Sequence, residues 1–87
     1  MTRSKWFLHA GRSLEVRDHR VMTVLQLWIY EDDRPLGLHS TLSLREAAAG
    51  LAGGRDLLGQ AMDCAVRDVE AGRFFIGPGL PALLAAE

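Results

Sequence analysis

The sequence predicts an α+β domain, in which an antiparallel meander of three to four strands is followed by two helices packed on one face of the sheet. Short runs rich in aromatic and branched residues, separated by turn residues, fill the first half of the chain. In the second half the apolar residues recur at helical spacing. A chain of 87 residues is one domain, spanning 1–87, with a small core.

The first two strands are predicted at residues 5–9 ("KWFLH") and 13–17 ("SLEVR"). Gly11 lies between them and readily adopts the positive φ that a tight turn needs. The two runs are therefore expected to pair as a hairpin.

A longer run, residues 20–30 ("RVMTVLQLWIY"), alternates as a strand. Its first face is the more apolar and is predicted to meet the core; it carries Val21, Thr23, Leu25, Leu27 and Ile29. Its second face, with Gln26, Trp28 and Tyr30, is amphipathic. That face suits either a partner surface or a second core layer, covered by the C-terminal segment or by the N-terminal strands.

A turn is predicted at residues 31–34 ("EDDR"), because short acidic side chains bond to nearby backbone amides. Residues 35–43 then return as a strand, with Pro35 at its start or on an edge. Leu36, Leu38 and Leu42 are expected on one side, with His39 and Thr41 on the side away from the helices. Residues 25–40 therefore form a hairpin with an acidic tip.

Ser43 and Glu46 form a capping box that starts the first helix, and Gly53 with Gly54 ends it. The second helix is predicted over residues 55–72, and Gly72 fits its C-terminal cap. Its buried stripe comprises Leu58, Met62, Ala65 and Val69.

Residues 74–87 are too apolar for a free tail, and they either close the core or dock on another copy of the chain. Together with Trp28 and Tyr30 on the second sheet face, this segment leads us to expect a homodimer.

The composition is that of an ordinary folded protein, with 48% hydrophobic and 24% charged residues. No apolar run approaches the roughly 20 residues that span a bilayer, and no signal-peptide pattern follows the charged N-terminus. We therefore expect a cytoplasmic protein that does not contact a membrane. The excess of Arg, Ala and Gly suggests GC-rich coding and a bacterial or phage origin.

No catalytic, metal or cofactor motif is found, so a non-enzymatic role is expected. The three histidines lack metal-ligand spacing, and the glycine-rich stretches match no phosphate-binding fingerprint. Cys64 is predicted to pack as a small hydrophobe between the helices. The acidic trio of residues 31–33 is interpreted as a solvated turn rather than a cation site.

The leading hypothesis is a protein-interaction or regulatory module that presents the aromatic sheet face and the acidic hairpin to a protein partner. Aromatic side chains with polar tips dominate binding hot spots. The predicted partner-binding residues are Trp28, Tyr30, Glu31, Asp32, Asp33, Arg34 and His39.

The alternative is nucleic-acid binding through the basic N-terminal third, in which aromatic rings stack on bases. Residues 1–20 carry a net charge of +3 and the remainder −4. The residues that would bind are Arg3, Lys5, Trp6, Arg12, Arg17 and Arg20. For the unequal distribution of charge we favour a third interpretation. The two oppositely charged parts of the chain simply meet, in the fold or across a dimer.

Overall fold

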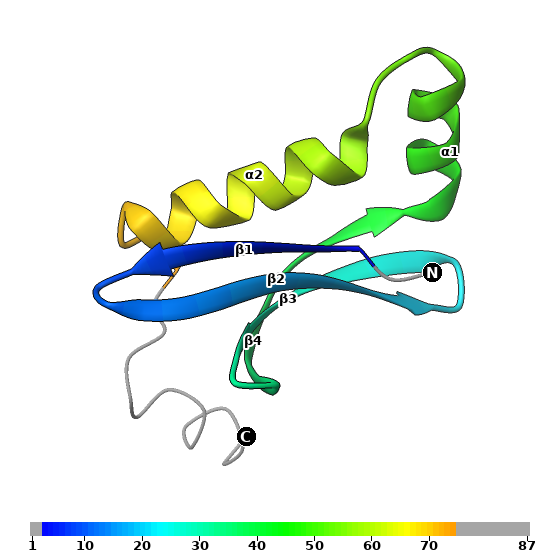
Figure 1. Ribbon diagram of the computed structural model, residues 1–87. Helices are drawn as coiled ribbons and strands as arrows, with labels where there is room; N and C mark the ends of the chain where they lie inside the picture. The colour runs from blue at the N-terminus through cyan, green and yellow to red at the C-terminus, as the bar shows by residue number, and fades with distance from the viewer. Residues whose placement is uncertain (1–2, 75–87) are drawn as a thin grey trace.

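The computed structural model describes residues 3–74 of the chain. Four strands precede two helices, as Figure 1 shows. The elements are β1 (Ser4–His9), β2 (Arg12–Val21), β3 (Val24–Glu31), β4 (Arg34–Ser43), α1 (Leu44–Ala52) and α2 (Leu57–Glu70). The predicted α+β class, with an antiparallel sheet followed by two helices, is confirmed.

The strands form one antiparallel sheet in the order β1-β2-β3-β4, so β1 and β4 are its edges. Both helices lie on the same side of this sheet, with α2 running across it (Figure 1). A sheet covered by helices on one face leaves its other face for solvent, for a partner or for another segment.

The prediction of a single strand over residues 20–30 is wrong, because the chain reverses at Met22 and Thr23. β2 continues to Val21, which pairs with Val24 at the start of β3. Met22 adopts a φ of 55°, which allows this tight reversal in a stretch without glycine. The faces predicted for residues 25–30 are nevertheless correct, since Leu25, Leu27 and Ile29 are buried. Val21 and Thr23, which were predicted on the same core face, are exposed because they lie at the reversal.

The predicted turn at residues 31–34 is confirmed, and Asp32 and Asp33 both have positive φ. The strand that follows does not alternate simply. Its register against β3 shifts twice, so that Trp28 faces Leu38 while Leu27 faces Ser40. The extra residue between them is His39, and a bulge of this kind changes which side the following side chains take.

These shifts contradict two of the predicted orientations in β4. Leu36 is buried, as expected, but Leu38 lies on the side away from the helices, opposite Trp28. His39 instead faces the helices, where its ring bonds to Asp68 of α2. Period-two alternation fails here because each bulge inserts one residue into only one of the paired strands.

Both helix starts are set by side-chain caps. The Ser43 hydroxyl accepts from the Glu46 amide of α1 at 3.3 Å, as predicted from the capping box. The Asp56 carboxylate caps α2 by accepting from the Gly59 amide at 3.1 Å. α1 ends at Gly53 and Gly54, again as predicted, and Gly54 has a φ of 81°.

The core lies between the sheet and α2. The predicted stripe of α2 is confirmed, since its members are buried or half-buried in one cluster with residues of β2, β3 and β4. The buried core cluster is Leu14, Val16, Leu27, Ile29, Leu36, Met62, Ala65 and Val69. Cys64, expected in the helix packing, is instead exposed. Of the segment 74–87, Phe74 packs against the core and the rest lies outside the described residues.

Within residues 3–74, none of the helices combines the length and the apolar character that crossing a membrane requires.

Candidate functional site

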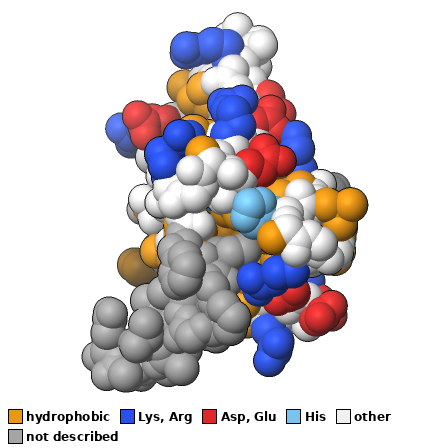
Figure 2. Space-filling model, turned by 90° about the vertical axis from the view of Figure 1, so that its left-hand side faces the viewer, with side chains coloured by type: hydrophobic (Ala, Val, Ile, Leu, Met, Phe, Trp, Pro, Cys, Tyr) orange, Lys and Arg blue, Asp and Glu red, His pale blue; other side chains and the backbone are white. Residues whose placement is uncertain are grey.

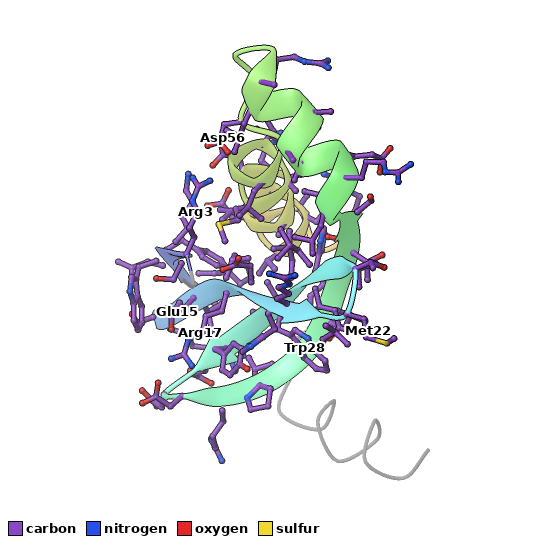
Figure 3. The ribbon with its side chains drawn as sticks, turned by 90° about the vertical axis from the view of Figure 1, so that its right-hand side faces the viewer. Arg3, Glu15, Arg17, Met22, Trp28 and Asp56 are labelled. Carbon is purple, nitrogen blue, oxygen red and sulfur yellow. The ribbon has the colours of Figure 1, made fainter. Side chains whose placement is uncertain are left out.

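The candidate site is the side of the sheet away from the helices, here called the outer face. Strand register places its side chains in rows: Trp6 pairs with Glu15, which pairs with Tyr30, while Arg17 pairs with Trp28, which pairs with Leu38. In Figure 3, Arg17 and Trp28 lie below the sheet and the helices lie above it. The side chains on this face include Trp6, Leu8, Glu15, Arg17, His19, Gln26, Trp28, Tyr30 and Leu38.

Arg17 is the centre of this surface. Its Nε donates to Glu15 Oε1 at 2.7 Å, another of its nitrogens binds Asp33, and its guanidinium carbon lies 4.2 Å from the centre of the Tyr30 ring. The hydrogen bonds to Asp33 and then to Glu15 raise the pKa of Arg17 above its ordinary value. Arg17 therefore stays charged, stacks on an aromatic face and neutralises a buried carboxylate.

The aromatic side chains of β3 are held by hydrogen bonds. His19 Nε2 lies 2.6 Å from the Tyr30 hydroxyl, and Trp28 Nε1 donates to Gln26 Oε1 at 3.0 Å. The predicted placement of Trp28 and Tyr30 on the side away from the helices is thus correct. Both rings are half-buried.

The outer face also exposes large apolar side chains. Trp6 is 60% exposed, Leu8 72% and Leu38 41%. Trp6 and Leu8 lie on the edge strand β1 and Leu38 on the other edge strand β4, with the half-buried Trp28 and Tyr30 on β3 between them. Exposed large apolar side chains spread over one face of a sheet mark a surface where other molecules bind. The ionic groups among them are paired with one another, so the surface is apolar with an internally neutralised centre.

The acidic hairpin tip borders the outer face at the β3–β4 turn. Glu31 accepts two bonds from Arg12, at 2.6 and 3.0 Å, and this contact lowers the pKa of Glu31. Asp33 binds Arg17. Asp32 and Arg34 are exposed at the tip. Two of the three predicted acidic residues are thus already neutralised by arginines of β2.

The basic N-terminal third meets the acidic remainder within the fold, as we favoured from the sequence. Arg3 binds Asp56 at the start of α2 through paired contacts of 2.8 and 3.0 Å, and Lys5 binds Asp63. Figure 3 shows Arg3 and Asp56 pointing toward each other above the sheet. The Arg3 bond, with help from the Gly59 amide, lowers the pKa of Asp56 to about 2.

Four of the five N-terminal basic residues proposed to contact phosphate therefore have carboxylate partners: Arg3, Lys5, Arg12 and Arg17. The fifth, Arg20, is exposed near the end of β2. Figure 2 shows the same mixing at one end of the molecule, where positive and negative side chains are interspersed. A basic stripe that tracks a nucleic-acid backbone requires charges of one sign together.

His39, the remaining predicted partner-binding residue, lies on the helix side of the sheet and not with Trp28. Its Nδ1 is 2.9 Å from Ser40 Oγ and its Nε2 is 2.8 Å from Asp68 Oδ2. Its ring also lies 5.5 Å from that of Phe74, and its side chain is only 11% exposed. Serine, histidine and aspartate also form the catalytic triads of hydrolases. Here, however, His39 lies inside the packing and joins β4 to α2.

Among residues 3–74, no group of three or more histidine, cysteine or acidic side chains is arranged to hold a metal ion.

Among the outer-face residues named above, sequence reasoning missed Leu8, Glu15, His19 and Leu38. The alternation of "SLEVR" was a usable signal, because it sets Glu15 and Arg17 opposite the apolar Leu14 and Val16. No sequence pattern placed Leu38 on the outer face, because a bulge in β4 determines which side of the sheet its side chain takes.

Comparison of the chain with protein-family models, with curated proteins and with solved structures found no match.

Proposed function

We propose that this protein is a small interaction module that binds a protein partner through the outer face of its sheet, with the hairpin tip at the rim. The observation that carries the proposal is the exposure of Trp6, Leu8 and Leu38 on a face whose charged groups are paired with one another.

The arrangement suits protein binding for two physical reasons. Rings held by hydrogen bonds, as Trp28 and Tyr30 are, lose little side-chain entropy when a partner covers them. A charge that already has its counter-ion costs less to remove from water than an unpaired one, which applies to Glu15 and Arg17. Apolar anchors around a neutralised centre resemble the composition of an interface core.

Nucleic-acid binding receives less support. Stacking on Trp6 is sterically open, but the arginines and lysine that would neutralise phosphates are engaged by carboxylates. Breaking those pairs would offset much of the electrostatic gain on which such binding depends.

The test is affinity capture from a lysate of the source organism, with each sample split into nuclease-treated and untreated halves. The variants are Leu38→Lys and Trp28→Ala on the outer face. Leu51→Lys is the matched control, because Leu51 is an equally large apolar residue of α1, 65% exposed. Circular dichroism confirms that each variant is folded.

We expect one stoichiometric protein that survives nuclease and moderate salt, bound by the wild type and by Leu51→Lys. Truncating a hot-spot tryptophan weakens binding by about 2 kcal/mol or more, which is roughly 30-fold in Kd. Capture that is unchanged in both outer-face variants would reject the outer face as the site. Partners that disappear with nuclease would favour nucleic-acid binding instead.

A further inference from the structure

The two edges of the sheet differ in how well they are protected against pairing with another strand. β4 contains Pro35 and two register shifts, and both features interrupt strand pairing. β1 has neither: all six of its residues pair in regular register with β2, and its sequence contains no proline. An uninterrupted edge of this kind is a template for an added strand.

The backbone of β1 offers hydrogen-bonding groups along this edge. His9 and Arg12 flank a two-residue turn, Ala10–Gly11, and the residues that close such a turn bond to each other. At the other end, the Arg3 carbonyl accepts from the Asp18 amide. Alternate residues of an antiparallel strand bond to the same neighbour. The odd-numbered residues therefore bond to β2, and the amides and carbonyls of Ser4, Trp6 and Leu8 point away from it, to an edge that no other strand within residues 3–74 covers.

The side chains at the same positions are the most exposed apolar groups of the outer face. Trp6 and Leu8 stand on that face at 60% and 72% exposure. Phe7, between them, points to the helix side and packs half-buried against the core cluster. The β1 edge therefore carries apolar side chains on both faces of the sheet.

We propose that β1 pairs antiparallel with β1 of a second copy of this chain, about a two-fold axis at Phe7, joining the two sheets into one. This pairing matches each residue before Phe7 with the residue equally far after it. Trp6 then lies opposite Leu8 of the partner subunit, twice over, and Phe7 meets its own equivalent.

The symmetry selects a second copy over a foreign strand, because β1 is complementary to itself. Each exposed Trp6 covers an exposed leucine, and the backbone groups that point outward on one copy meet those of the other in register. The paired Phe7 side chains extend the core across the axis. The proposal goes beyond the interaction module above and does not depend on it, because edge-to-edge pairing keeps Trp6 and Leu8 on the outer face of the joined sheet.

The first test is the molar mass of the full chain, measured by size-exclusion chromatography with light scattering over a range of concentrations. We expect the wild type at twice the 9.6 kDa of one chain. Leu8→Lys, which places a charge on the edge, is expected to run as a monomer. Leu38→Lys on the opposite edge strand is the control and is expected to stay dimeric.

The second test fixes the register by cross-linking in a Cys64→Ala background, which removes the exposed native thiol. Trp6→Cys and Leu8→Cys chains are mixed under mild oxidation. Opposed residues of a hydrogen-bonded pair have Cα atoms about 5.5 Å apart, within disulfide reach, so the mixed disulfide should dominate.

A monomeric wild type, or a dimer that Leu8→Lys leaves intact, would overturn the proposal. Self-linked Trp6→Cys chains without the mixed product would overturn the two-fold at Phe7. These outcomes are independent of the affinity-capture test. If Leu38→Lys no longer captures a protein partner but keeps the molar mass of a dimer, the result bears on the interaction module and leaves the β1 pairing intact.

Discussion

His39 and Asp68, 29 residues apart in the chain, join β4 to α2 through a contact of 2.8 Å between Nε2 and Oδ2. Arg73 adds a second bond to the same carboxylate at 2.9 Å. The His39 bond first, and then Arg73, lower the pKa of Asp68 below its ordinary value of 3.8. The ionised carboxylate is therefore part of what holds the helix layer on the edge of the sheet.

The first prediction concerns acid stability. A carboxyl whose pKa is lower in the folded state stabilises the fold above its unfolded pKa, and that stabilisation is lost as the pH falls through the folded pKa. The free energy of unfolding should therefore decrease below about pH 4. Asp68→Asn should be less stable at neutral pH and show a shallower decrease, as measured by urea unfolding at several pH values.

Asp56, whose pKa is about 2, contributes to the same acid loss, so the Asp68→Asn variant should keep part of the slope. Asp32→Asn, at the exposed tip of the hairpin, is the matched control. An unchanged slope in Asp68→Asn would show that the His39 contact does not stabilise the fold through the ionised carboxylate.

The second prediction concerns Gly50, which is buried where α1 approaches the start of α2. A Cβ at this position would lie 2.7 Å from Leu57 Cγ and 3.1 Å from the Arg55 carbonyl oxygen. Alanine normally stabilises a helix relative to glycine by about 0.5–1 kcal/mol. Here we expect Gly50→Ala to lower the free energy of unfolding by about 1–3 kcal/mol, because overpacking outweighs propensity.

Ala49→Gly, at the preceding exposed position of α1, tests the propensity alone and should cost about 1 kcal/mol. Both variants are measured by urea unfolding. If Gly50→Ala were more stable than the wild type, the conclusion that α1 packs closely on Leu57 would be wrong.

The third prediction concerns the turn that sequence reasoning missed. Met22 has a φ of 55° and is 86% exposed, so its side chain gains little packing there. Positive φ costs a residue with a side chain roughly 1–2 kcal/mol, and glycine avoids this cost. Met22→Gly should therefore raise the free energy of unfolding by up to about 1 kcal/mol after the loss of chain entropy is included.

Thr23→Gly in the same turn is the control, because Thr23 is not among the described residues with positive φ. It should lower stability by about 0.5–1 kcal/mol. Both variants are measured by thermal unfolding. A Tm above that of the wild type for Met22→Gly and below it for Thr23→Gly would support the turn geometry, and a lower Tm in both variants would contradict it.

Local patterns determined much of this architecture. The Ser43–Glu46 cap, the glycines at Gly53 and Gly54 and the apolar stripe of α2 are short-range features, because each depends on residues within a few turns of one another. The alternation around Trp28 likewise set that ring opposite the core. Strands first and helices second could thus be predicted from composition and spacing.

Strand register and pairing were decided only in three dimensions. Nothing local marked the reversal at Met22 or the bulge that turns His39 toward Asp68, since both depend on how β2, β3 and β4 align. The partners of Arg3 and Lys5 lie 53 and 58 residues away on α2, beyond any local pattern. The sequence by itself determined which segments are strands and helices and that their charges are unequally distributed. The tertiary structure decided which charges neutralise each other, because the partners come from different elements. Packing of α2 on the sheet paired Arg3 with Asp56 and Lys5 with Asp63, and the alignment of β2 with the β3–β4 turn paired Arg17 with Asp33 on the outer face.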